Sequence, residues 1–255
     1  MTNRSIEMFQ LTIPIQKKVK HLSDEDRYTY YMLGHIFNEL MSLQKLVGFA
    51  LPKHNDMRPS RLKPELSQAL FLFRLACSKI WEATITLCKK EVSNTLRTLI
   101  LPKMQDGAER WKTLNRAINE AKWLSELRNR LGFHFPTFEE WKPFTTPNDD
   151  WVDDVVFLGT QSGNTFYESS DSVAQHWTLH QYGNEISASS LDSMIWQMIE
   201  LLRVMETFLE DAISVMIAEV ILDGHGQKES VGRVAGPEHD LVSIPFWTAM
   251  PISRP

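Results

Sequence analysis

The strongest constraint on the fold is a long run of apolar residues at helical spacing between residues 189 and 222. Apolar side chains recur there every three or four positions, which is the pattern of an amphipathic helix with one face in a core. Ser189 and Asp192 are spaced to cap its start, and Gly224 is placed to end it. The apolar positions are Met194, Ile195, Met198, Ile199, Leu202, Met205, Phe208, Leu209, Ala212, Ile213, Met216 and Val220.

Three further segments show the same period and predict long helices. Ser23 and Asp26 form a capping pair at the start of the first, and Pro64 suits the first turn of the second. A shorter helix is expected at 94–101. The three long segments are 24–50, 64–92 and 107–131. Four long helices with short connections predict a mostly α-helical chain built as an antiparallel four-helix-bundle-like domain.

The segment 152–182 has a different character. Its stretches VVFLGTQSGNTFYE and HWTLHQYG place apolar and β-branched residues around a turn that contains Gly and Asn, which is typical of a hairpin. We therefore expect a small β-hairpin at about 152–182, inserted into a helical bundle domain that covers residues 1–222.

Two regions rich in proline predict little regular structure. Three prolines between 136 and 147 make 135–150 mostly non-helical, although Thr137 and Glu140 are spaced to cap a single turn. Residues 223–255 are rich in Gly and Pro and carry no period, so they are expected to form an irregular C-terminal tail. The apolar stretch LVSIPFW within that tail favours packing as an extended arm.

Composition and cysteine spacing limit the compartment and the kind of partner. A net charge of −5 argues against a surface covered by nucleic acid, while leaving room for a local basic patch. Cys77 and Cys88 lie eleven residues apart on one predicted helix, about 16 Å at roughly 1.5 Å per residue, so they cannot bridge. We expect two buried thiols in a reducing compartment. No signal peptide or membrane span is predicted, which favours a cytoplasmic location.

The sequence predicts neither a metal nor a cofactor. It has no Gly-rich nucleotide loop and no Glu-x-x-His pair on any predicted helix. His176 and His180 have an i, i+4 spacing, but they fall in a predicted strand, about 13 Å apart at roughly 3.3 Å per residue. The acidic run at 149–154 lacks the alternation and glycine of a calcium loop.

The most informative polar cluster lies at the end of the helix predicted at 107–131. The stretch ELRNRLGFHFPTFEEW, residues 126–141, carries Arg128, Asn129, Arg130 and His134 among aromatic residues. Metal-free RNA cleavage needs a group that moves a proton and a cation that stabilises the phosphate as negative charge builds. Histidine suits the first task near neutral pH, and the planar fork of arginine suits the second. Asn129 is placed to orient either group.

The segment Arg128-Asn129-Arg130-Leu131-Gly132-Phe133-His134 resembles the motif of HEPN-domain proteins, an Arg followed by a polar residue and then, a few residues later, a His. The resemblance implies a helical bundle, a metal-independent endoribonuclease and a homodimer whose two motifs face one cleft. It assigns Arg128, Asn129 and His134 to catalysis, with Arg130 as an RNA contact. It also implies a toxin or phage-defence effector, with RNA and an antitoxin or other protein as partners.

The sequence leaves one alternative function open. The same segment is compatible with a non-catalytic helical module that binds protein or RNA, in which the arginines and His134 only stabilise a helix end. On one ideal helix Arg128 and His134 lie about 120° apart, whereas Arg130 and His134 share a face. Arg233 and His239 repeat the spacing in RVAGPEH, where Gly and Pro argue against a helix.

Overall fold

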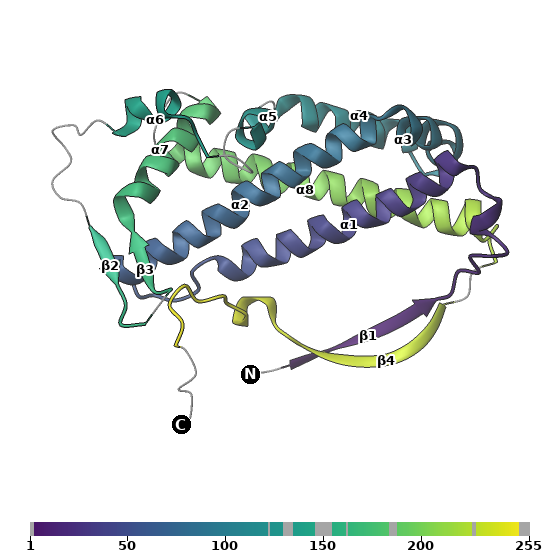
Figure 1. Cartoon of the computed structure of the whole chain (residues 1–255). Coiled ribbons are helices and arrows are strands. Elements are labelled where there is room, and N and C mark those ends of the chain that lie inside the picture. Colours follow the sequence, from purple (N-terminus) through teal and green to yellow (C-terminus); the bar gives the residue numbers. More distant parts are fainter. Residues whose placement is uncertain are drawn as a thin grey trace. The chain divides into compact units, whose positions relative to one another are not determined.

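The computed structural model describes residues 3–121, 123–129, 135–145, 155–161, 163–183, 188–225 and 228–249. The chain is mostly helical, as predicted, and carries two small antiparallel sheets (Figure 1). The longer helices are α1 (Asp24–Ala50), α2 (Pro59–Cys88), α4 (Gly107–Glu120), α7 (Glu168–Gly183) and α8 (Ala188–Val215). The shorter ones are α3 (Lys90–Thr95), α5 (Trp123–Leu127) and α6 (Phe138–Thr145).

Two compact units divide the chain, and each is assembled from three segments. Unit 1 comprises Met1–Ser42, Lys79–Leu124 and Ile195–Glu238, and unit 2 comprises Leu43–Ser78, Ser125–Met194 and His239–Pro255. In the part of the chain that the structure describes, no helix is long and apolar enough to cross a membrane.

The start of α1 is confirmed in detail. The hydroxyl of Ser23 accepts a hydrogen bond from the Asp26 backbone N–H at 3.1 Å and donates one to its carboxylate at 2.6 Å. This cap satisfies one of the free N–H groups at a helix start. Leu33, Ile36 and Leu40, which recur at helical spacing, are buried, whereas Tyr31 in the same apolar series is exposed, so the period gives most of the core face of this helix.

The second helix begins at Pro59, five residues before the predicted Pro64. Pro64 lies inside it and has no N–H to donate to the carbonyl of Ser60 four residues earlier. The indole N–H of Trp247 donates to that carbonyl instead, at 2.9 Å. A side chain of the C-terminal tail thus replaces the missing helical hydrogen bond, which a local sequence pattern does not reveal.

The remaining helical segments differ from their predicted bounds. The helix expected at 107–131 is broken at Ala121, whose φ of −93° and ψ of 45° are not helical, and α5 follows. Trp123 is buried there and donates to Gln197 at 3.0 Å. The short helix expected at 94–101 is part of a longer series: α3, the π-helical turn η2 (Leu96–Ile100) and the 3-10 turn η3 (Leu101–Lys103).

The last helix is confirmed and ends where it was expected to end. It continues from α8 into the π-helical turn η5 (Met216–Ile221), and Gly224 has a φ of +75° and donates to the carbonyl of Ala218 at 2.8 Å. A residue without Cβ adopts this left-handed conformation without strain. The predicted cap at Ser189 and Asp192 involves side chains outside the described part.

The β-hairpin predicted at 152–182 is correct only in part. Its strands are β2 (Val156–Leu158) and β3 (Thr165–Tyr167), which pair antiparallel. The stretch HWTLHQYG is not a strand; it belongs to α7, where Val173 and Trp177 are buried one turn apart. Burial on a helical face outweighs the strand preference of its aromatic and β-branched residues. The acidic run up to residue 154 lies outside the described residues.

The segment 135–150 was also expected to be mostly non-helical, and α6 corrects this. The predicted pair Thr137 and Glu140 caps it, since both the N–H and the hydroxyl of Thr137 donate to the Glu140 carboxylate at 2.8 Å. The cap supports a helix that runs to Thr145 with Pro143 inside it.

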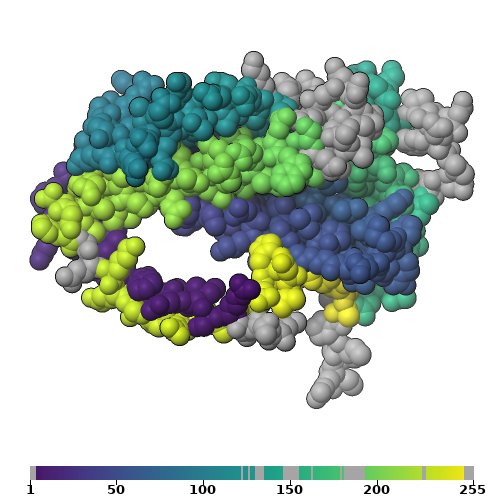
Figure 2. All heavy atoms as spheres, turned by 180° about the vertical axis from the view of Figure 1, so that it is seen from behind, coloured from purple at the N-terminus to yellow at the C-terminus, as the bar shows by residue number. Residues whose placement is uncertain are grey.

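The tail expected to be irregular contains a long strand, β4 (Lys228–Pro237), which pairs antiparallel with β1 (Asn3–Leu11). The two strands are separated by more than two hundred residues, and the local spacing of apolar residues predicts neither of them. Figure 2 shows β1 in purple along β4 in yellow-green. We call this pair the ribbon.

Residues 239–249 pack in unit 2 as an extended arm, as the apolar stretch LVSIPFW predicted. Lys53 donates to the carbonyls of His239 and Val242 at 2.7 and 2.8 Å, and the N–H of Ile244 donates to Phe49 at 2.9 Å. Asn164, in the turn between β2 and β3, exchanges two hydrogen bonds with the backbone of Thr248. The arm thereby joins the α1–α2 connection to the hairpin.

Candidate functional site

The residues of the predicted motif directly follow α5. Arg128 is half-buried and Asn129 is exposed, and the Arg128 guanidinium Nη1 donates to the Asn129 amide oxygen at 2.9 Å. The predicted role of Asn129 as an orienting group therefore has a matching contact with the arginine. Arg130 and His134 lie outside the described residues.

Two phenylalanines beyond the motif, Phe135 and Phe138, are exposed, whereas Trp141 and Phe144 are half-buried. Phe135 is 99% exposed and Phe138, at the start of α6, is 72% exposed. The ammonium of Lys142 lies 5.7 Å from the centre of the Phe138 ring. An exposed ring beside a cation is a surface on which an unpaired base stacks while its phosphate meets the charge.

The helix that carries this surface is fixed at both ends within unit 2. The Thr137–Glu140 cap holds its start, and Phe144 contacts His180 of α7 edge-on at 5.3 Å between ring centres. Phe138 therefore remains in solvent on an anchored helix, and Phe135 lies in the segment just before it.

The repeat of the motif spacing in the tail forms no comparable arrangement. Arg233 lies in β4 opposite Glu7, and His239 begins the 3-10 turn η6 (His239–Leu241). The His239 ring packs over Gly48, where an added Cβ would come within 2.7 Å of its Nε2, and contacts Phe49. This histidine has a packing role, and the copy is not on an α-helix, as Gly and Pro predicted.

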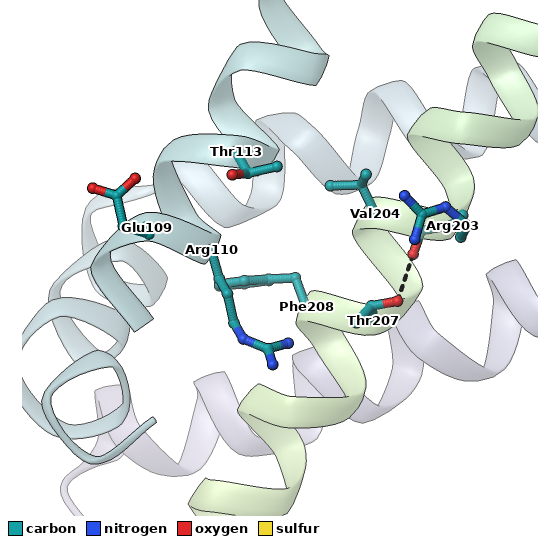
Figure 3. A pocket seen from close by; sticks show the side chains of 7 residues that line it. All are labelled: Glu109, Arg110, Thr113, Arg203, Val204, Thr207 and Phe208. Carbon is teal, nitrogen blue, oxygen red and sulfur yellow. Dashed lines mark hydrogen bonds between the residues drawn. The ribbon is translucent and has the colours of Figure 1, made fainter. Parts of the chain in front are cut away.

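A pocket of about 230 Å³ lies between α4 and α8 in unit 1 and was not predicted from the sequence (Figure 3). Its walls are Glu109, Arg110, Thr113, Arg203, Val204, Thr207 and Phe208. Arg110 pairs with Asp211, and Arg203 bonds Glu200 at 2.6 and 2.9 Å, which lowers the pKa of the Glu200 carboxyl. Both arginines already have carboxylate partners, so the pocket offers no uncompensated positive charge for a phosphate.

A second pocket in unit 1, of about 220 Å³, lies between α1 and α2. Lys79 there contacts both oxygens of Glu39 at 3.0 and 3.1 Å, and His35 lies 3.8 Å from the same carboxylate. The cation is again matched by an acid. Paired charges on helix faces leave no motif in a single sequence, which is why neither pocket was predicted.

Two expectations about ligating residues are corrected. His176 and His180 lie one helical turn apart on α7, roughly 6 Å between Cβ atoms, and not 13 Å apart in a strand. Within the described ranges, however, no group of three or more His, Cys, Asp or Glu side chains is arranged to hold a metal. Cys77 is buried, which raises the pKa of its thiol, but Cys88 is exposed, so only one of the two thiols is buried as predicted.

Comparisons with known proteins give no relative. No protein-family model matches the chain, no curated protein matches it, and no solved structure matches its fold.

Proposed function

We propose that this chain is a metal-independent endoribonuclease of HEPN type, acting in the cytoplasm as a toxin or phage-defence effector. The observation that carries the proposal is the hydrogen bond from Arg128 to Asn129, which a capped helix with the exposed Phe138 follows in the sequence. An oriented guanidinium recognises a phosphate, and exposed rings bind unpaired bases. Both features suit single-stranded RNA better than a folded protein surface.

In the proposed reaction, His134 moves a proton at the ribose 2′-hydroxyl or at the leaving 5′-oxygen. Arg128 stabilises the charge that builds on the phosphate, and Asn129 holds the guanidinium in place through the bond at 2.9 Å. Arg130 contacts a neighbouring phosphate of the RNA. None of these steps requires a metal ion.

Such a site needs a helical bundle and a homodimer. The helical segments α1, α2, α4–α5 and α8 form the antiparallel four-helix bundle of a HEPN domain, and two copies bring their motifs to one cleft. The homodimer supplies Arg128 and His134 from different chains, which relieves the unfavourable angle between them on one helix. An antitoxin or another protein would restrain the nuclease in the cell.

The test is RNA cleavage in the presence of EDTA. The purified chain is incubated with tRNA and total RNA, and His134→Ala is compared with His21→Ala, a substitution of an exposed histidine in unit 1. We expect cleavage by the unmodified chain and by His21→Ala, and a loss of roughly 10²–10⁴-fold for His134→Ala at an unchanged melting temperature.

Three results would count against the proposal. Activity that EDTA abolishes and magnesium or manganese restores would contradict the His and Arg chemistry. Full activity in His134→Ala with a lower melting temperature would make His134 a helix cap. RNA binding without cleavage would favour the alternative, a non-catalytic helical module that binds RNA or protein.

A further inference from the structure

The ribbon is exposed on both of its faces. Every described side chain from Arg4 to Gln10 is exposed, and so is all of β4 except Gly236. Five large apolar side chains are each between 45% and 58% exposed: Ile6, Met8, Phe9, Val231 and Val234. A two-stranded ribbon with neither face covered is marginally stable in water. This ribbon therefore lacks the third strand or covering layer that would stabilise it.

The two edges of the ribbon differ in how they are protected. A bulge between Met8 and Phe9 leaves Val231 without a partner on β1, and the adjacent Gly232 has a φ of +121°. The strand then ends at Pro237. Bulges and prolines are features that keep an edge from pairing further. The nine residues of β1 contain no proline and, among the described residues, pair only with β4, so the outer edge of β1 is open.

We propose that the open edge of β1 pairs antiparallel with β1 of a second copy of this chain, forming a four-stranded sheet in the order β4–β1–β1–β4. The two-fold axis passes through the pair formed by Ile6 and Ile6 of the second copy. The resulting homodimer interface is an intermolecular sheet built by the ribbon.

The register follows from side-chain alternation. Arg4, Ile6 and Met8 share one face of β1, while Ser5, Glu7 and Phe9 share the other. A two-fold axis normal to the sheet places residues of the same face opposite each other. The axis must therefore pass between the two copies of one residue, which lie directly opposite each other. An axis at Glu7 would place two carboxylates directly opposite each other. An axis at Met8 would place Ile6 opposite Gln10.

The axis at Ile6 produces a continuous apolar row. Val234 lies opposite Ile6 across the ribbon, so the row runs Val234, Ile6, Ile6 and Val234 over the four strands. Gly232 is the partner of Met8 and offers no side chain to extend a row centred there. Aliphatic pairs in adjacent strands are the units that stabilise a sheet.

Charges on the ribbon are compatible with a second copy as the occupant. Arg4 is paired with Glu238 at 2.9 Å, and Glu7 lies opposite Arg233 within the same ribbon. In the proposed register Glu7 meets Ser5 of the second copy and Arg4 meets Met8, so no like charges are brought directly opposite each other. The edge is complementary to itself, and no foreign strand is required.

Disulfide trapping tests the register in the whole chain. In a Cys88→Ser background, which removes the exposed thiol, Ile6→Cys is compared with Arg4→Cys. Residues opposite each other have Cα atoms about 4.5–5.5 Å apart, within disulfide range. The two Arg4 positions would be offset by four residues, roughly 13 Å. We expect a covalent dimer on mild oxidation of Ile6→Cys and none for Arg4→Cys.

Charge substitution tests the same contact without oxidation. By sedimentation equilibrium, Ile6→Lys and Ile6→Glu should each weaken the dimer at least tenfold, since like charges placed directly opposite each other repel. An equimolar mixture of the two should restore it, which also shows that both variants fold. Val234→Lys, on the same face and similarly exposed, should change the dimer less.

A monomeric chain at 50 micromolar, equal trapping at Arg4 and Ile6, or no recovery in the mixture would overturn the inference. A monomeric chain would also remove the dimer that the proposed nuclease needs, whereas the trapping and mixing results concern the ribbon contact alone. Loss of cleavage in His134→Ala with an intact dimer would support the nuclease without bearing on the ribbon contact. A dimer that survives Ile6→Lys would rule out the ribbon contact and leave the nuclease proposal standing.

Discussion

At the scale of single residues, substitutions at Arg128 and Asn129 distinguish the effect of the guanidinium charge from the effect of its orientation. Arg128→Ala should lower the single-turnover rate of RNA cleavage by about 10²–10³-fold through lost stabilisation of the phosphate. Arg128→Lys should recover part of it, because an ammonium cannot make the bidentate fork. Asn129→Ala should cost about tenfold, the effect of one lost hydrogen bond.

Asn129→Asp serves as the matched control for this series. The carboxylate still accepts the hydrogen bond from Arg128 Nη1, but its negative charge offsets the positive charge of the guanidinium. It should therefore reduce cleavage more than Asn129→Ala does. Equal or higher activity in Asn129→Asp would show that the bond only holds the end of α5 together.

The two thiols should differ sharply in reactivity. Cys88 is exposed, whereas Cys77 is fully buried and its raised pKa keeps it in the unreactive thiol form. At pH 8 an aromatic disulfide reagent should titrate one thiol in the native chain and two after unfolding in guanidinium. Cys88→Ser should leave none accessible in the native state. Rapid labelling of Cys77 would mean that its part of α2 opens readily.

At the scale of elements, Asn164 is the residue through which the tail arm is held to the hairpin. Its side chain is buried, donates to the carbonyl of Thr248 at 2.6 Å and accepts from its N–H at 3.1 Å. Asn164→Ala leaves both backbone groups unpaired and should lower the free energy of unfolding by about 1–3 kcal/mol. Urea denaturation measures this loss, and proteolysis should cleave the tail sooner.

Asn94 on α3 provides the comparison for this prediction. It is exposed, and Asn94→Ala should change the free energy of unfolding by less than about 0.5 kcal/mol. An effect of Asn164→Ala no larger than that of Asn94→Ala would show that the arm is held by its other contacts.

How far the sequence predicts these elements depends on where the stabilising contacts come from. The cap at Ser23 and the glycine at 224 act within a few residues, so the start of α1 and the end of the last helical segment, after η5, were predictable. The start of α2 was not, because Pro64 is tolerated only through Trp247, far along the chain. The stretch HWTLHQYG has residue types that favour a strand. It is helical because α7 buries Trp177, which is a tertiary effect that the local sequence does not contain.

The ribbon shows the same limit more strongly. β1 and β4 contain few strongly apolar positions and depend on pairing between segments more than two hundred residues apart. For the candidate site, residue types and spacing indicated Arg128 and Asn129, and the structure adds their contact. The pockets of unit 1 depend on which helix faces meet, which one sequence does not specify.

At the scale of the whole molecule, the two units share three helices. α1 passes from one unit to the other after Ser42, α2 after Ser78 and α8 after Met194. Unfolding one unit alone would end three helices in mid-length and leave their backbone groups without partners. We therefore expect one cooperative transition.

Fluorine-labelled tryptophan can measure this directly. Trp123 belongs to unit 1 and Trp177 to unit 2, and both are buried. Their resonances, assigned with Trp123→Phe and Trp177→Phe, should disappear at the same urea concentration. Midpoints separated by more than their error would show that the units unfold independently.

The order of synthesis gives the ribbon one more consequence. β1 leaves the ribosome before any helix, but β4 follows α8, so its partner does not yet exist. At about 5–20 residues per second, β1 waits on the order of tens of seconds for that strand. During this time Ile6, Met8 and Phe9 form an unpaired apolar segment of the nascent chain. β1 therefore reaches its native pairing only after β4 has been synthesised, although it is made before every helix that separates the two strands.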